Sequence, residues 1–471
     1  MSKNDYWKLS AFEGAKLIRD GSISAEDLVS SCIERVNQTN NKINAIVDDL
    51  REPALEKAHE LDKLTKKGKF QGPLHGVPIT IKENIDQKGY ATPNGLEALK
   101  DLIAPGNAPV VDNLEQDGAI IIGRTNTPEF SMRGTTDNVI HGRTYNPWND
   151  WASPGGSSGG ASAAVMSGMG SLAHGNDIAG SLRIPSTATG ACTVKPGLGR
   201  IPAYNPSQTQ ERGLVAQLMS VQGIIAREIK DVRLGMQSLI NYDPRDPWMV
   251  EMPFESNPIT SPIKIGYTKE TLGETLHPAV DKALANAIEA LKDAGYILEE
   301  VVLPEFEDAT NFSARTLFGE LKALHEKDYK KLGSKDFNLV ADNYFKIISP
   351  FEGEDLLLGM AKRSYFFREW NLFFRKYPLV LTPFLLYPTY EWNRDTQGLE
   401  GTKEVLAGMF YAHTMNYMGI PAGVVSANYN DGLPVGVQII SSRFREDIIL
   451  QACEEIEKRV GIMAEKLFER G

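Results

Sequence analysis

Apolar residues recur at helical spacing in two segments near the N-terminus. The first segment follows Ser24, whose side chain suits a helix N-cap, and it places acidic residues in the first turn. The second runs from Pro53 to Phe70 and ends in lysines and a glycine, as a helix C-terminus often does. We therefore expect an amphipathic helix over each segment.

The apolar period changes to two over residues 77–82, where valine and isoleucine alternate with Pro78, Thr80 and Lys82. This alternation predicts a short strand with Thr80 and Lys82 on one face. On pattern alone, a lysine at a strand end is typical of a solvated sheet edge.

Helix and strand patterns alternate further along the chain. Residues 108–130 read as a helix, a glycine stop and an apolar strand, and residues 262–303 repeat strand, helix and strand. Such alternation is typical of a mixed or parallel sheet that is covered by helices.

Aromatic residues are concentrated between Phe306 and Trp392, which hold 19 of the 40 in the chain. Two interpretations stay open. The segment forms a helical layer that packs its own core, or several of its rings line an apolar substrate pocket.

Composition and charge narrow the function classes. A hydrophobic content of 42% predicts a buried core, and a net charge of −11 argues against nucleic acid as a partner. Cys32, Cys192 and Cys453 are widely spaced, so they suggest neither a disulfide framework nor a zinc site. No apolar run has the length of a membrane span or of an N-terminal secretion signal, and we expect a cytoplasmic protein that does not contact membranes.

Glycines surround two adjacent serines in residues 153–160, SPGGSSGG. A helix-compatible run of small residues follows, which favours a tight turn at a helix N-terminus over a linker. Farther on, Ala179 and Gly180 precede Ser181, and such small residues would leave consecutive backbone N–H groups free to hold an oxyanion.

A serine nucleophile needs a base, and two kinds are available. Residues 155–159 fit the GxSxG motif, in which the base would be a histidine such as His413 or His325. That motif requires a buried strand directly before the serine, whereas the segment before Ser157 is polar and interrupted by proline. The other base is Lys82, which would need a pKa lowered from about 10.4 to roughly 7–8.

The motifs GVPITIKENID, SPGGSSGGASAAV, GSLRIPS, VKPGLGRIP and NYMGIPAGVVSANYNDGLPVGVQII resemble, in order, those of the amidase signature family of serine hydrolases. The resemblance covers nearly the whole chain. It implies an α/β amidase signature fold with a large, mixed, mostly parallel twisted sheet covered on both faces by helices. It also implies one domain over 1–471, with a signature core at about 70–230, a variable region at about 303–400 that contributes to the pocket, and a completing part at about 400–460.

The same resemblance implies the site. Ser181 would be the nucleophile, Ser157 the bridging serine, held through a cis Gly156–Ser157 peptide, and Lys82 the general base. The backbone N–H groups of Ile178, Ala179, Gly180 and Ser181 would form the oxyanion hole. No metal or organic cofactor is implied.

Three residues depart from the usual family spelling: Glu83 replaces an aspartate, Ala179 a glycine, and Asn176 a threonine or serine. Ala179 would reshape the oxyanion hole if its position required a positive φ. The HGND spelling is closer to members that hydrolyse aryl amides and cyclic nylon oligomers than to the amidotransferase subunits.

The resemblance leaves the substrate open among several classes. We expect a small amide, hydrophobic or aryl-bearing, with carbamates as an extension. The glutamine-hydrolysing amidotransferase subunits are the alternative, but their acidic residue seven positions before Asn416 is Met409 here. An inactive binding protein that keeps the fold is a third possibility. The sequence contains no coiled-coil heptad from which an oligomeric state could be predicted.

Overall fold

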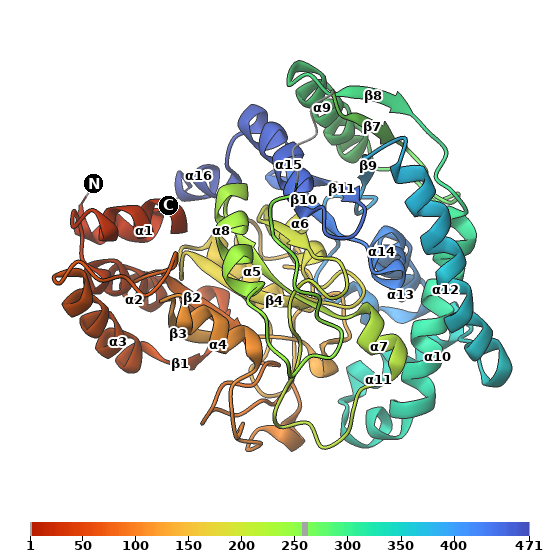
Figure 1. Cartoon of the computed structure of the whole chain (residues 1–471). Helices are drawn as coiled ribbons and strands as arrows, with labels where there is room; N and C mark the ends of the chain where they lie inside the picture. The colour runs from red at the N-terminus through yellow and green to blue at the C-terminus, as the bar shows by residue number, and fades with distance from the viewer. Residues whose placement is uncertain (1, 257–261, 471) are drawn as a thin grey trace.

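The computed structural model describes residues 2–256 and 262–470, and a single sheet runs through the middle of the molecule (Figure 1). Its strands are β1 (Ile46–Asp49), β2 (Pro78–Lys82), β3 (Ile120–Thr125), β4 (Leu172–Asp177), β5 (Cys192–Lys195), β6 (Val221–Ala226), β7 (Lys264–Tyr267), β8 (Ile297–Glu300), β9 (Leu379–Pro383), β10 (Ala422–Asn430) and β11 (Leu433–Ser441).

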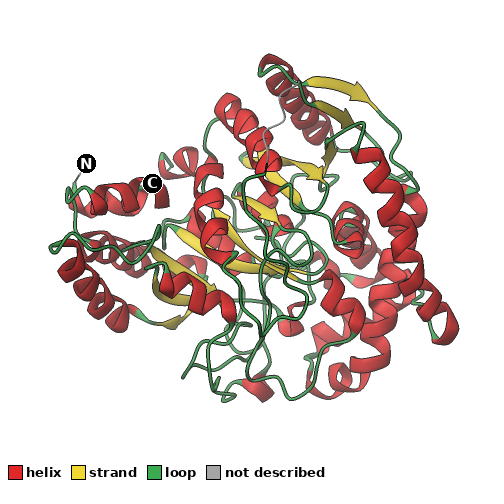
Figure 2. Cartoon of the chain, viewed as in Figure 1, coloured by secondary structure: helices red, strands yellow, loops and turns green. Residues whose placement is uncertain are grey.

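Helices surround this sheet (Figure 2). They are α1 (Ala11–Arg19), α2 (Ala25–Ile43), α3 (Arg51–Thr65), α4 (Pro109–Gln116), α5 (Gly159–Met166), α6 (Arg183–Thr189), α7 (Leu214–Met219), α8 (Ile229–Leu239), α9 (Pro278–Asp293), α10 (Phe306–Leu332), α11 (Lys335–Ile348), α12 (Gly353–Phe374), α13 (Gly398–Ala407), α14 (Phe410–Met418), α15 (Glu446–Val460) and α16 (Met463–Phe468).

The strand order is β1-β3-β2-β4-β6-β5-β10-β11-β9-β7-β8. The expected α/β class with a mixed sheet is confirmed, but the expectation of a mostly parallel sheet is wrong. Within the described residues, six of the ten strand pairings are antiparallel. One cause is the tight turn at Asp431 and Gly432, both with positive φ, which joins β10 to β11 as a hairpin.

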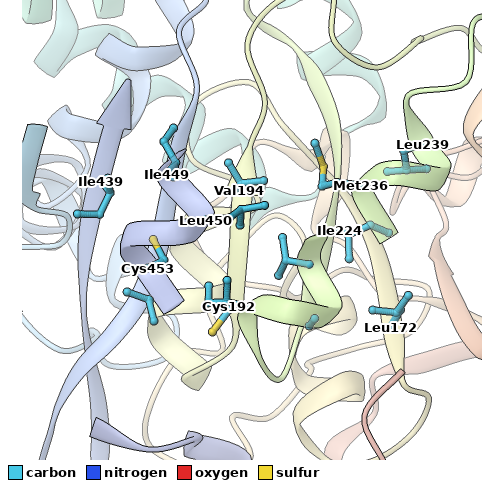
Figure 3. Packing of buried hydrophobic residues seen from close by; sticks show 14 of the residues in the cluster. Leu172, Cys192, Val194, Ile224, Met236, Leu239, Ile439, Ile449, Leu450 and Cys453 are labelled. Atoms are coloured by element: carbon cyan, nitrogen blue, oxygen red, sulfur yellow. The ribbon is translucent and has the colours of Figure 1, made fainter. Parts of the chain in front are cut away.

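Successive residues of the central strands enter different cores on the two sheet faces. Val425 and Ile439 pack with α8, α9 and α15, whereas their neighbours Val424 and Ile440 pack with α12 and α14. Figure 3 shows part of the first core, in which Val194 and Ile224 of the sheet lie near Leu450 and Met236. This period of two buries both faces, so the expected helical cover on each face is confirmed.

The local predictions near the N-terminus are confirmed with shifted bounds. Helix α2 begins after Ser24, whose Oγ accepts the Asp27 N–H at 2.9 Å. Helix α3 ends at Thr65, five residues earlier than expected, because Gly68 adopts a positive φ in the turn that follows. The predicted strand and helix patterns at 77–82, 108–130 and 262–303 appear as β2, α4 with β3, and β7, α9 and β8.

The aromatic-rich segment forms the long helices α10, α11 and α12. Phe306, Phe366, Trp370 and Phe384 are buried in the core that α10 and α12 share with α14. The helical-layer interpretation therefore accounts for most of the rings.

The three cysteines are buried and unpaired. None of the helices in the described ranges combines the length and apolar character needed to cross a bilayer. The division of the chain into one domain and its cytoplasmic location stay predictions.

Candidate active site

Strand β2 lies between β3 and β4, so it is an inner strand of the sheet rather than an edge strand. All five of its residues are buried, and the Lys82 side chain has no exposed surface. The solvated-edge interpretation of Lys82 is therefore wrong, because β2 is an inner strand and Ser157, Ser158 and Asn176 surround the Lys82 amine.

The glycine run forms a turn that leads into α5, as predicted. Gly155 has a φ of +78°, in the left-handed region that favours glycine. A Cβ on Gly160 would lie 2.5 Å from the backbone N and O of Asn126. The Gly156–Ser157 peptide is cis, as the resemblance implied.

This turn brings Ser157 against the Lys82 amine. Lys82 Nζ lies 2.7 Å from Ser157 Oγ, 3.1 Å from Ser158 Oγ and 2.8 Å from Asn176 Oδ1. Burial of the amine lowers the pKa of Lys82 to about 7, although the charges of Asp177 and Glu83 act in the opposite direction. A large fraction of the amine is therefore neutral near pH 7.

The hydrogen-bond partners of the Lys82 amine determine which of them its N–H groups donate to and where its lone pair points. Ser158 Oγ donates to the Asn176 carbonyl, so it accepts from Lys82, and the carbonyl oxygen of the Asn176 amide can only accept. A neutral amine has two N–H donors and one lone pair. Once both donors are used, the lone pair is left for the hydroxyl proton of Ser157.

Ser181 follows the end of β4, beside the same turn. The Ser158 N–H donates to the Ser181 carbonyl at 3.2 Å, and Ser157 and Ser181 line one cavity. Across the two described ranges, Ser181 Oγ has no hydrogen-bond partner, and the residue keeps 9% of its surface exposed. Ser157 and Ser181 thus lie at the wall of one cavity, and Lys82 lies behind Ser157, in contact with its hydroxyl.

A buried ion pair shapes the backbone just before Ser181. The Asp177 carboxylate accepts the Gly180 N–H at 2.7 Å and the Arg183 Nε–H at 3.1 Å. Burial raises the pKa of Asp177, but the charge and hydrogen bonds of Arg183 outweigh burial and hold it below its ordinary value. Arg183 in turn donates to Asn416 Oδ1 at 2.5 Å and to Gln438 Oε1 at 2.8 Å.

This arrangement corrects one member of the predicted oxyanion hole. The Gly180 N–H is engaged by Asp177 and is not free for a ligand. In residues 2–256 and 262–470, no acceptor is found for the N–H groups of Ile178, Ala179 and Ser181. The positive φ that this turn requires is at Gly180, whose φ is +115°. Ala179 does not have a positive φ, so the alanine fits without backbone strain.

The cavity has a volume of about 310 Å³ and a mixed wall. Phe130, Tyr204 and Tyr329 contribute rings. Of the aromatics between 306 and 392 only Tyr329 lines the cavity as the described residues form it, so the interpretation in which several of these rings line the pocket is not supported. Polar residues occupy much of the remaining wall: Asn84, Asn94, Asn176, Asn205, Gln208, Arg212, Ser220, Gln222 and His325.

The histidine alternatives are not supported by the contacts. His413 Nδ1 lies 2.6 Å from Ser313 Oγ, and burial lowers the pKa of His413 to about 4. His325 lines the cavity without a hydrogen bond to either serine in the described ranges. No strand directly precedes Ser157, as a nucleophile elbow would require.

Sequence reasoning missed the roles of Asp177 and Arg183. Both are fully buried. The sequence signal that could have indicated their pairing is an acidic and a basic residue six positions apart in a run of small and apolar residues. Met409, in the place of the amidotransferase acid, is buried in an apolar cluster and does not line the cavity.

Comparisons with known proteins identify the relatives of this chain. A family model described as amidase matches residues 27–450. An indoleacetamide hydrolase of Bradyrhizobium diazoefficiens is 43% identical over 99% of this chain and 89% of its own length. An acylamidase of Rhodococcus erythropolis is 33% identical over 97% of this chain and 96% of its own length.

Among solved structures, a bacterial aryl acylamidase of the amidase signature family superimposes with a TM-score of 0.83. The two chains are 26% identical, and the match covers 98% of each. Together with the family match over most of the chain, these similarities show that the chain belongs to the amidase family of enzymes that hydrolyse amide C–N bonds.

Proposed function

We propose that this amidase hydrolyses small amides that carry an aromatic group, through an acyl-enzyme on Ser181. The observation that carries the proposal is the 2.7 Å contact between Lys82 Nζ and Ser157 Oγ at the wall of the cavity that Ser181 also lines. Three aromatic rings in that wall and the indoleacetamide hydrolase relative support an aryl-bearing substrate. A volume of about 310 Å³ is at the small end for ligand pockets.

In the first step, neutral Lys82 takes the hydroxyl proton of Ser157, which takes the proton of Ser181. Ser181 Oγ then bonds to the carbonyl carbon, and the N–H groups of Ile178, Ala179 and Ser181 hold the oxyanion. The C–N bond breaks as the relay returns the proton to the leaving nitrogen. Water attacks the acyl-enzyme through the same relay and releases the carboxylic acid.

A substrate panel tests the aryl preference. We expect arylacetamides and anilides to have higher kcat/KM values than aliphatic amides of similar size, because their rings can pack against Phe130, Tyr204 and Tyr329. Aryl carbamates should be slower substrates of the same site. Initial rates of ammonia or amine release measure each compound.

Glutamine and aryl esters serve as controls in this panel. Glutamine hydrolysis should be negligible because apolar Met409 replaces the acidic residue of the amidotransferase subunits. A preference for small, charged aliphatic amides over every aryl amide would contradict the proposed substrate class.

The Gly180→Ala substitution tests the oxyanion loop. A Cβ on Gly180 would lie 2.6 Å from Ile184 Cδ1 and 2.7 Å from Ala412 Cβ, at a φ of +115°. The loop must therefore shift, and we expect kcat to fall by about 10²–10³-fold, the loss typical of a missing oxyanion donor. Steady-state kinetics with an anilide measures kcat.

Gly295→Ala is the matched control, because Gly295 has a φ of +90° with open space around it and lies far along the chain after α9. It adds similar backbone strain, so its melting temperature should fall while kcat is unchanged. An unchanged kcat in folded Gly180→Ala would contradict the assignment of this loop.

A further inference from the structure

The active-site cavity contains a cation that the proposed proton relay does not use. Arg212 lies in the loop between β5 and α7 and is part of the cavity wall. Its side chain is half-buried. Within residues 2–256 and 262–470, the guanidinium of Arg212 has neither a salt bridge nor a hydrogen bond, and only its carbonyl is bonded, by Gln217 Nε2 at 2.6 Å.

Among the described residues, all five buried arginines have partners for their guanidinium groups: Arg227 donates to three backbone carbonyls, and the other four pair with carboxylates. Arg133 pairs with Asp395 at 2.6 Å, Arg183 with Asp177 at 3.1 Å and Arg200 with Glu446 at 3.2 Å. A guanidinium presents five N–H donors, and withdrawing it from water without a partner is costly. The guanidinium of half-buried Arg212 has neither a carboxylate nor a carbonyl partner, which sets it apart from the buried arginines of the described residues.

Two acids near this loop accept hydrogen bonds from backbone N–H groups rather than from Arg212. Glu320 of α10 accepts the N–H groups of Val215 and Ala216, each at 2.8 Å. Asp246 accepts the N–H groups of Ala203 and Trp248, each at 2.8 Å. Burial lowers the pKa of Arg212, and the charges of Asp246 and Glu211 only partly oppose this.

Arg212 is also part of the wall of a second cavity of about 220 Å³, which shares Ala203, Tyr204, Gln208 and Ser220 with the first. The unpaired cation thus lies where the active-site cavity adjoins a second space. Gln208 and Tyr204 add further hydrogen-bonding side chains beside it. The guanidinium of Arg212 is a planar fork of N–H donors, with which arginine holds a carboxylate in two parallel hydrogen bonds.

We propose that Arg212 forms an anion subsite that binds a carboxylate on the substrate, away from the amide that Ser181 attacks. This inference rests on the proposed function and narrows its substrate class to aryl amides that also carry a carboxylate. The carboxylate would supply the missing partner of the guanidinium, while the ring would lie among Phe130, Tyr204 and Tyr329.

A matched pair of substrates tests the subsite. We expect para-carboxyphenylacetamide to have a higher kcat/KM than para-methylphenylacetamide, which has nearly the same shape without the charge. Arg212→Gln should lower kcat/KM for the carboxylate substrate by about 10- to 100-fold, the worth of a charged hydrogen bond, and leave the methyl compound unchanged. Arg212→Lys should retain part of the preference, because it keeps the charge but loses the fork.

Arg245→Gln is the control, because Arg245 lies beside the second cavity but is paired with Asp112 and Asp243. It should keep the wild-type preference between the two substrates. Equal rates for both compounds in the unaltered enzyme, or an equal loss for both in Arg212→Gln, would overturn the subsite. Turnover of the methyl compound reports on the proposed function alone, so a failure of the subsite is distinguished from a failure of the amidase proposal.

Discussion

Replacing Ser181 by alanine is expected to abolish amide hydrolysis and leave the fold intact. Loss of the nucleophile in serine hydrolases lowers kcat by about 10⁶-fold. Since Ser181 Oγ has no hydrogen-bond partner in the described ranges, its removal breaks no hydrogen bond of the folded protein. Single-turnover kinetics on an anilide and the melting temperature measure the two effects.

Ser186→Ala is the matched control, because Ser186 is buried five residues further on and only donates to the Leu182 carbonyl at 2.8 Å. Its kcat should be near that of the unaltered enzyme. A fluorophosphonate should add to Ser181, identified by mass spectrometry of the modified peptide. An adduct on another residue, or none at all, would refute the assignment and would favour an inactive binding protein in the latter case.

The second large effect is expected at Lys82. In the unaltered enzyme, kcat/KM should rise by about tenfold per pH unit below pH 7 and then level off, because only the neutral amine can accept the Ser157 proton. The sign follows from the lowered pKa of about 7, above which Lys82 is neutral. Lys82→Met should lower kcat by about 10²–10⁴-fold, the range of general-base catalysis, and remove this inflection. A pH series of initial rates measures both.

Lys195 provides an internal control for this prediction. It is also fully buried, and burial lowers its pKa to about 7, but its Nζ donates to the Pro196 carbonyl and has no contact with a serine in the described part of the chain. Lys195→Met should therefore keep the inflection near pH 7. If the inflection vanishes with Lys195 and persists with Lys82→Met, Lys82 is not the base.

The sequence predicted the local elements well because their signals are local. The Ser24 cap and the alternation before Lys82 depend on neighbours within one turn or one strand. The prediction of strand direction failed because the direction depends on which strands, distant in the sequence, pair with each other, as β5 pairs with β10. The burial of Lys82 was missed for the same reason, since Ser157, Ser158 and Asn176, which are 75 to 94 positions away in the sequence, surround its amine only after the chain has folded.

The site residues came from the resemblance more than from physical pattern. Lys82, Ser157 and Ser181 are 24 to 99 positions apart, and nothing local in their segments requires them to meet. The engagement of Gly180 by Asp177 could not be foreseen, because it depends on a side-chain rotamer fixed by Arg183. The roles of Lys82, Ser157 and Ser181 in catalysis stay predictions until the substitutions above are measured.

The contacts of Arg183 link the oxyanion loop to distant parts of the chain. Its guanidinium pairs with Asp177 beside the loop and donates to the Ala412 carbonyl, Asn416 Oδ1 and Gln438 Oε1, which are 229 to 255 positions further along the sequence. The loop is therefore coupled to the packing of α14 and β11, and a substitution that loosens either element is expected to lower kcat together with stability.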